Sequence, residues 1–182
     1  MKDKLDFDTL FKMHYNDILR LAFFITTDRI LAEDVAQEAL LIVYDKLHTL
    51  KDKSKFKYWL NKIVINCANQ VLRKNSKYIY TENIEFINDV LNVDIDKNDP
   101  LYIMEEKELN RFIYSAIASL GDLERKIFVL RYFEKYSFKE IADTLEINAS
   151  TARTIVFRGK KLLENKLEQY YNPDPKEMGN QM

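Results

Sequence analysis

The residues best suited to bind another molecule lie near the end of the chain, between positions 150 and 161. At about 100° per residue on a helix, one side of this segment carries cations, hydroxyls and an aromatic ring: Ser150, Arg153, Thr154, Phe157, Arg158 and Lys161. The opposite side is small and apolar: Ala152, Ile155, Val156, Gly159 and Leu163. Guanidinium groups read guanine edges and hydroxyls reach phosphates or bases, so the pattern predicts a helix that lies in the major groove of DNA.

The residues just before this segment predict the short helix and the turn that would hold it in place. Ser137 and Glu140 have the spacing of a capping box, in which each side chain bonds a backbone N–H of the other residue. Residues 145–148 form the turn, and Asn148 or Ser150 caps the second helix. The whole stretch is typical of a helix-turn-helix, although an ordinary helical hairpin with a basic end has the same pattern.

A second cationic segment occupies residues 51–77, where Asp52 is the single acid. A loop at 51–58, KDKSKFKY, mixes lysines with aromatic residues, and a helix at 59–74 follows it. Its polar positions lack acids: Asn61, Lys62, Asn66, Asn69, Gln70 and Arg73. Cations that follow phosphates, aromatics that stack and amides that read base edges suit single-stranded nucleic acid. Alternatively the aromatic residues are core and the lysines only solubilise the loop, and for Trp59 we favour the core.

A third surface is predicted on the helix expected at residues 29–47. Its apolar side collects Leu31, Val35, Ala39, Ile42 and Val43. The opposite side groups acids and an amide around Leu41: Asp34, Gln37, Glu38 and Asp45. An apolar centre with a charged rim indicates a docking surface. A solvated side with one exposed leucine is equally ordinary, and the wheel geometry alone favours that simpler interpretation.

Composition limits the class of protein. The chain has 182 residues, enough for one medium domain or two small ones, and a formal net charge of −1. That average hides alternation, because residues 3–45 and 82–108 are mostly acidic whereas 51–77 and 153–166 are basic. Cys67 is the only cysteine, so an internal disulfide is excluded and a reducing compartment is expected. We expect a cytoplasmic protein without membrane insertion, since no signal core or membrane-length apolar run occurs.

Helical periodicity dominates the chain, and neither glycine nor proline precedes Pro100, so we predict an all-α fold. Besides the helices already named, we expect helices at 7–26, 101–119 and 123–134. We predict two small helical domains at residues 1–77 and 100–170, joined by an acidic linker at 78–99 and followed by a flexible tail at 171–182.

No catalytic constellation is present in the sequence. His14 and His48 are far apart and have no partner cysteines, so the spacing of a zinc site is missing. There is no glycine-rich phosphate loop and no nucleophile elbow. We therefore expect no enzymatic activity, no cofactor and no metal.

Three segments together resemble a known family, the extracytoplasmic-function (ECF) sigma factors of the bacterial sigma-70 family. AEDVAQEALLIVYDKL, residues 32–47, resembles the helix that these proteins dock on the β′ clamp helices of RNA polymerase. FKYWLNKIVINCANQVLRK, residues 56–74, resembles the segment that opens and reads the −10 promoter element. Residues 120–163, which contain the predicted helix-turn-helix at 137–163, resemble the region that reads the −35 element. The resemblance covers residues 7–74 and 99–166 and rests on the order and spacing of the three segments.

The resemblance implies a role for each surface. Core-polymerase contacts are implied at Asp34, Val35, Gln37, Glu38 and Leu41. Contacts to −10 DNA are implied at Ser54, Phe56, Lys57, Tyr58, Asn61, Lys62, Asn66 and Arg73. Contacts to −35 DNA are implied at Ser150, Thr151, Arg153, Thr154, Phe157, Arg158 and Lys161. The implied partners are core RNA polymerase, through its β′ clamp helices and β flap, promoter DNA and an anti-sigma factor.

The chain also departs from the family pattern. Gly121 stands where a proline usually follows leucine, Ser150 stands where a glycine often opens the recognition helix, and Ile155 replaces a common basic residue. The last departure predicts a weaker or altered −35 preference. We expect a sigma factor that binds core polymerase, recognises both promoter elements and assists DNA melting. The alternatives are a conventional helix-turn-helix regulator that binds duplex DNA alone and a helical adaptor without a DNA role.

Overall fold

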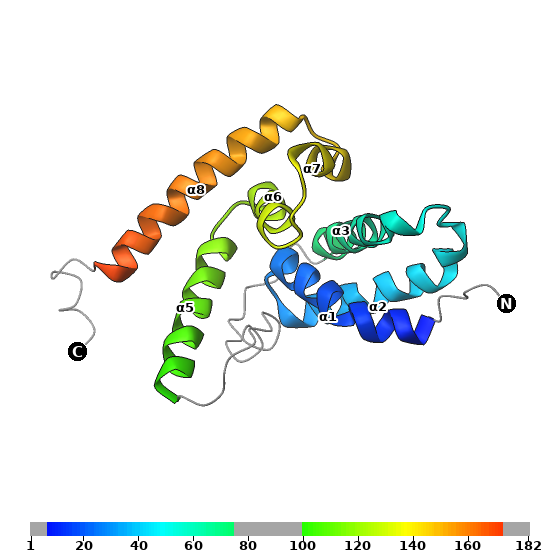
Figure 1. Ribbon diagram of the computed structural model, residues 1–182, viewed down its shortest axis with the longest axis horizontal. Helices are drawn as coiled ribbons and strands as arrows, with labels where there is room; N and C mark the ends of the chain where they lie inside the picture. The colour runs from blue at the N-terminus through cyan, green and yellow to red at the C-terminus, as the bar shows by residue number, and fades with distance from the viewer. Residues whose placement is uncertain (1–6, 75–99, 173–182) are drawn as a thin grey trace. The chain divides into compact units, whose positions relative to one another are not determined.

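The computed structural model describes residues 7–74 and 100–172 (Figure 1), with side chains from 12 to 74 and from 108 to 172. All regular secondary structure in these two stretches is helical, which confirms the all-α prediction. The chain forms two compact units, Met1–Phe112 and Ile113–Met182. The linker predicted at 78–99 and nearly all of the tail predicted at 171–182 lie outside the described residues.

The first unit is built from α1 (Phe7–Thr26), α2 (Arg29–Lys46) and α3 (Phe56–Lys74), and each of these helices packs against the other two (Figure 1). Their apolar sides meet in one core, whose members include Ile18, Leu21, Phe24, Leu31, Val35, Val43, Leu60, Val64 and Val71. No helix in the described part of the chain is long and apolar enough to cross a membrane.

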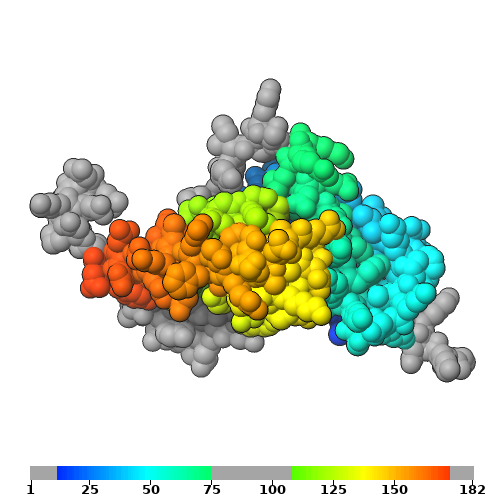
Figure 2. Space-filling view, turned by 90° about the horizontal axis from the view of Figure 1, so that it is seen from above, coloured from blue at the N-terminus to red at the C-terminus, as the bar shows by residue number. Residues whose placement is uncertain are grey.

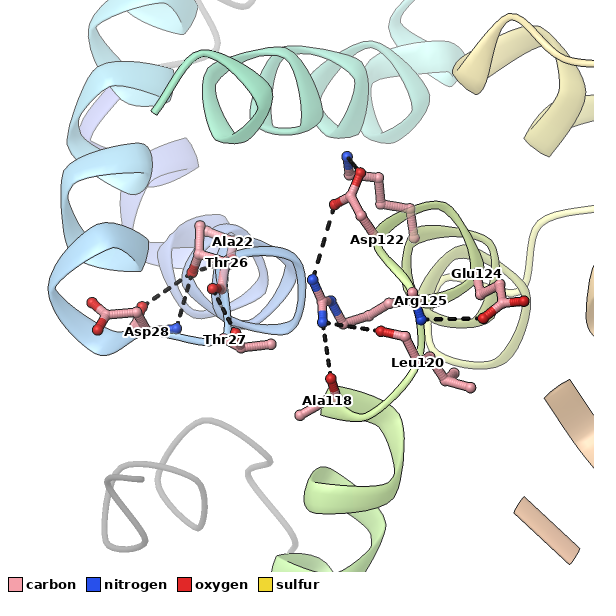
Figure 3. Close-up of polar contacts among 11 residues, drawn as sticks. Ala22, Thr26, Thr27, Asp28, Ala118, Leu120, Asp122, Glu124 and Arg125 are labelled. Atoms are coloured by element: carbon pink, nitrogen blue, oxygen red, sulfur yellow. Dashed lines mark hydrogen bonds and ion pairs between the residues drawn. The ribbon is translucent and has the colours of Figure 1, made fainter. Parts of the chain in front are cut away.

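The break between α1 and α2 follows from three polar residues. Thr27 has a φ of 57°, in the left-handed region, which ends α1. The side chain of Asp28 accepts a hydrogen bond of 2.9 Å from the backbone N–H of Leu31 and so caps α2. Thr26 Oγ1 donates to the carbonyl of Ala22, 2.9 Å away (Figure 3). Thr27 and Asp28 thus interrupt the helix and cap the next one.

Between α2 and α3 the chain forms two short 3₁₀ helices, η1 (Leu47–Thr49) and η2 (Lys53–Lys55). The side chain of Asp52 accepts a 3.0 Å hydrogen bond from the backbone N–H of Ser54, which caps η2. Because η2 leads directly into α3, that helix begins at Phe56, earlier than the predicted start at Trp59. Most of the predicted basic loop is therefore helical.

The remaining helices are α5 (Pro100–Ala118), in which the division between the units falls, α6 (Asp122–Tyr132), α7 (Phe138–Leu145) and α8 (Ala149–Tyr171). Helix α6 packs on α7 and α8, which also pack on each other. The capping box before α7 is confirmed: Glu140 N donates to Ser137 Oγ at 3.2 Å, and Ser137 N donates to Glu140 Oε2 at 2.7 Å. Glu146 takes a left-handed φ of 58° and reverses the chain between α7 and α8. Asn148, not Ser150, precedes α8 as its N-cap residue.

The corner between α5 and α6 depends on a buried arginine that the sequence pattern did not single out. Arg125 Nη1 donates to the carbonyl oxygens of Ala118, at 3.0 Å, and Leu120, at 3.3 Å (Figure 3). Gly121 N donates to Glu124 Oε2 at 3.1 Å across the start of α6. Arg125 thus satisfies carbonyl groups at the C-terminal end of α5, where the helix offers no donors.

Candidate nucleic-acid and polymerase interfaces

The outer side of α8 is the first candidate interface, and its surface is seen in orange in Figure 2. All seven residues predicted to read −35 DNA are exposed: Ser150, Thr151, Arg153, Thr154, Phe157, Arg158 and Lys161. Phe157 is 74 % exposed, more than any other large apolar side chain in the described part of the chain. Ala152, Val156 and Gly159 are buried on the inner side. The predicted division of this helix into an outer polar side and an inner apolar side is confirmed, and contact with DNA stays a prediction.

The geometry of α8 explains how it can present these groups together. A methyl group at Gly159 would overlap the ring of Phe128, so glycine lets α8 approach α6 closely there. Thr154 Oγ1 donates to the carbonyl of Ser150 at 3.0 Å, which leaves the oxygen lone pairs of Thr154 to accept from a ligand. No acid occurs on α8 before Glu164, so the first part of the helix attracts an anionic ligand.

The second candidate interface is one side of α3. On an ideal helix, Tyr58, Lys62, Asn66, Asn69 and Arg73 fall within an arc of about 80°. Asn66 and Arg73 are exposed, whereas Tyr58, Lys62 and Asn69 are half-buried. This side is opposite the one that Leu60, Val64 and Val71 bury in the core. Two amides, a phenol and two cations in one row can contact the backbone and bases of a single strand.

Asn61 does not belong to this surface, and the prediction that it lies with the exposed polar residues is wrong. Its side chain is only 4 % exposed. The helical wheel gives the reason, because Asn61 is next to Leu60 and lies on the side of α3 shared with the buried residues Val64, Ile65 and Ala68. The prediction followed the polar residue type of Asn61 and not its angular position on the helix, which lies within the buried arc.

Three of the residues implied by the resemblance to contact −10 DNA, Ser54, Phe56 and Lys57, lie where η2 leads into α3. Ser54 is exposed, and its hydroxyl donates to Asp52 Oδ1 at 2.6 Å. The hydrogen bonds from the Ser54 hydroxyl and backbone lower the pKa of Asp52. Lys57 is exposed. Phe56 is half-buried, with its ring centroid 5.1 Å from that of His14 and 6.1 Å from that of Trp59. Phe56 therefore packs on its neighbours while keeping part of its ring at the surface.

The third candidate interface is the exposed side of α2. It forms a stripe at helical spacing that consists of Ile30, Asp34, Gln37, Leu41 and Tyr44. Leu41 is 71 % exposed and Tyr44 is 69 % exposed, so the apolar part of this surface is larger than the single leucine predicted from the sequence. The same wheel that grouped Asp34 with Leu41 places Ile30 and Tyr44 beside them, and that signal was missed. Three exposed apolar residues with polar neighbours are typical of an interaction surface.

Val35 was included among the polymerase contacts, and the structure contradicts this assignment. Its side chain is fully buried, with 0 % exposure, as expected for a member of the apolar side of α2. Glu38 is half-buried and remains next to the exposed stripe.

Cys67, on α3, is also buried, and this burial, with a smaller contribution from the charge of Glu38, raises the pKa of its thiol to about 11. A buried thiol with a raised pKa is unreactive, because little of it is in the thiolate form.

Two family models and several known proteins match this chain. Residues 10–78 match the family model described as Sigma-70 region 2, and residues 113–163 match Sigma-70, region 4. The chain is 30 % identical over 172 residues to the RNA polymerase sigma-H factor of Pseudomonas aeruginosa, covering 91 % of this chain and 88 % of that protein. It is 26 % identical over 157 residues to the ECF RNA polymerase sigma factor SigM of Bacillus subtilis, covering 86 % and 92 % of the two chains.

A solved structure has the same fold. It is described as the sigma factor RpoE in complex with the anti-sigma factor NepR from Bartonella quintana. The match has a TM-score of 0.66 at 20 % identity and covers 90 % of this chain and 97 % of that one. At this sequence identity, the similarity shows only that the two proteins share a fold.

Two helical units that match sigma regions 2 and 4 in this order define the class: the chain belongs to the sigma-70 family and, within it, to the ECF sigma factors. Such a protein binds core RNA polymerase and directs it to promoter DNA for the initiation of transcription.

Proposed function

We propose that the three exposed surfaces divide the work of a sigma factor among them. The stripe on α2, centred on Leu41 and Tyr44, binds the clamp helices of the β′ subunit. The exposed side of α3, with the segment at 52–58, melts and reads the −10 element. The outer side of α8 reads the −35 element. Residues 1–77 and 100–170 form the two working domains, with 78–99 as the linker between them.

The strongest support for this proposal is the division of α8 into a cationic outer side and an apolar inner side. The outer side has seven exposed residues, none of which is acidic. The inner side is buried at Ala152, Val156 and Gly159. A recognition helix needs this arrangement, because its inner side must be held rigidly while its outer side reaches base edges. Arg153 and Arg158 supply guanidinium groups for guanine, and Phe157 supplies an apolar contact for a thymine methyl group.

The −10 segment acts by a different principle. A base leaves the stack at a cost of a few kcal/mol, which a pocket formed by the protein must recover. The exposed hydroxyl of Ser54 and the partly exposed ring of Phe56 offer a hydrogen bond and a stacking surface for that base. Asn66 and Arg73 then follow the separated strand along α3. Polymerase fixes the distance between the two DNA-reading surfaces, so both act together only in the holoenzyme.

Run-off transcription with purified core polymerase on a genomic fragment library tests the proposal. Adding this chain should create start sites that core polymerase alone does not use. No new start sites would refute the promoter-reading function. A gel shift on the recovered fragments without polymerase provides the second arm, since tight and specific binding by the free chain would favour a conventional regulator.

The polymerase surface can be tested with a matched pair of apolar substitutions. Leu41→Ala should weaken binding to core polymerase, because Leu41 is the apolar centre of the α2 stripe. Met13→Ala is the control, since Met13 is 66 % exposed on α1 and lies outside the stripe. Equal affinity of both variants for core polymerase, measured by fluorescence anisotropy, would contradict the assignment of α2.

We also propose that an anti-sigma factor restrains the protein by covering the α2 stripe and the outer side of α8. The sigma factor in the Bartonella quintana structure is in complex with such a partner, and exposed apolar residues such as Tyr44 and Phe157 suit a protein cover. The protein performs no bond chemistry and works in the cytoplasm, where polymerase and promoter DNA meet. Native purification of the tagged chain should recover a stoichiometric partner besides polymerase. Recovery with polymerase alone would overturn this part of the proposal.

A further inference from the structure

The ring of Phe138 lies within about 6 Å of two arginines that come from different helices. It is the first residue of α7 and is half-buried. The guanidinium carbon of Arg131, on α6, lies 4.9 Å from the centre of its ring. The guanidinium carbon of Arg153, on α8, lies 5.6 Å from the same centre. Both distances are within the range of a cation–π interaction. The three helices of the helix-turn-helix unit therefore meet at this ring.

The ring and one of the two cations are held by other bonds. The Ser137–Glu140 capping box fixes the backbone at the start of α7, directly beside Phe138. Arg131 Nη1 donates to the carbonyl oxygen of Tyr136 at 2.8 Å, which ties this guanidinium to the turn before α7. Arg153 is exposed and comes from the helix that presents the DNA-reading residues. The ring of Phe138, on a capped helix, thus lies beside an exposed arginine of the helix that carries the DNA-reading residues.

We propose that Phe138 is a positioning residue for promoter reading: its ring holds the guanidinium of Arg153 in an ordered position before DNA binds. An exposed arginine samples many rotamers, and ordering it on binding lowers affinity. A ring that attracts the guanidinium in the free protein reduces this loss and limits the directions in which Arg153 can reach. The proposal rests on the −35-reading role proposed for Arg153 and adds a residue that does not itself touch the bases.

Two substitutions distinguish the effect of the aromatic ring of Phe138 from the effect of its apolar volume. Phe138→Leu keeps an apolar side chain but removes the π-system, whereas Phe138→Tyr keeps the ring. In NMR spectra of the free full-length protein, side-chain protons of Arg153 should be shifted upfield by the ring, with the assignment made from Arg153→Lys. Phe138→Leu should abolish this shift and Phe138→Tyr should retain it. Unshifted Arg153 signals in the wild-type protein would overturn the proposal without reference to DNA.

The functional arm uses holoenzyme assembled with the full chain and a duplex pool randomised over the −35 and −10 segments. Phe138→Leu should lower affinity for the selected wild-type sequence by about two- to five-fold, the size of one exposed cation–π contact. It should relax the same −35 base position that Arg153→Ala relaxes, and Phe138→Tyr should restore the preference. In the Arg153→Ala background, Phe138→Leu should have no additional effect.

The outcomes distinguish this inference from the proposed function. If Arg153→Ala relaxes a −35 position but Phe138→Leu acts equally in both backgrounds, Phe138 is only a packing residue and the inference fails alone. If Arg153→Ala changes no −35 position, the reading role of Arg153 fails and the inference fails with it. Thermal unfolding of Phe138→Leu provides the folding control, and a purely structural effect would reduce binding uniformly across the pool.

Discussion

The close approach of α8 to α6 at Gly159 leads to a quantitative prediction. A methyl group at this position would overlap Phe128 Cε2 and lie 3.1 Å and 3.2 Å from two further ring carbons. Phe128 is buried, and its ring centroid is 5.0 Å from that of Tyr132, so the ring has little room to move. Overpacking of this kind costs about 1–3 kcal/mol, and the better helix propensity of alanine offsets about 1 kcal/mol. Gly159→Ala should therefore destabilise the second unit by about 1 kcal/mol.

Hydrogen exchange measures this loss within the intact chain. Amides of α6 and α8 should exchange about five-fold faster in Gly159→Ala, since about 1 kcal/mol changes an opening equilibrium by that factor. Amides of α1 to α3 belong to the other unit and serve as the internal reference. Asn165→Ala is the matched control, because Asn165 is exposed on the same helix and gains propensity without a clash.

A second substitution tests the cause of the effect. Phe128→Leu removes the ring that the new methyl group would meet, so Gly159→Ala should cost less in this background than in the wild-type protein. Equal costs in the two backgrounds would show that the ring does not determine the effect. Slower exchange in Gly159→Ala alone would mean that helix propensity exceeds steric overlap, and would refute the reasoning.

Arg158→Ala should weaken binding of the holoenzyme to promoters with a strong −35 element by about 1–3 kcal/mol, the value of one bidentate base contact; equal loss on promoters without that element would argue against base reading. Asn66→Ala should slow open-complex formation more than initial binding in stopped-flow measurements, and equal loss in both steps would count against its role on the −10 strand. Asp28→Ala should destabilise the first unit by about 1 kcal/mol through the lost helix cap, measured as faster exchange of α2 amides; an unchanged rate would show that the cap is dispensable. The hydrogen bonds from Ser137 lower the pKa of Glu140, so its stabilising effect is present above the ordinary glutamate pKa and decreases as the pH falls through the lowered one. Glu140→Gln should remove that part of the pH dependence of thermal unfolding, and an identical pH profile would contradict the assignment.

Several features of the fold could be predicted because they depend on residues close together in the chain. The bounds of α1, Phe7–Thr26, and the capping box of Ser137 and Glu140 follow from hydrogen bonds between residues three or four positions apart. The two sides of α8 follow from the helical period alone, which correctly separated exposed Phe157 from buried Val156. The break at Thr27 and Asp28 depends on the same kind of local hydrogen bond.

The surfaces were predicted less completely, for a physical reason that differs from residue to residue. Val35 and Asn61 were assigned by resemblance and residue type, but burial depends on which side of α2 or α3 meets the other helices. Phe56 became the start of α3 because the Asp52 cap and η2 extend the helix backwards. The helical wheel alone places Tyr44 on the same side of α2 as Leu41. Its exposure follows from the tertiary structure, because the opposite side of α2 is buried in the core.

The sequence by itself determined that the chain is helical, where the main helices lie and which side of α8 is cationic, because these properties repeat along a short stretch of chain. Only the tertiary structure brought Arg131, Phe138 and Arg153 together and set Gly159 against Phe128. These contacts join residues from different helices, and their distances depend on how the helices pack. No local pattern encodes that packing, because it is decided by the fit of all the buried side chains at once.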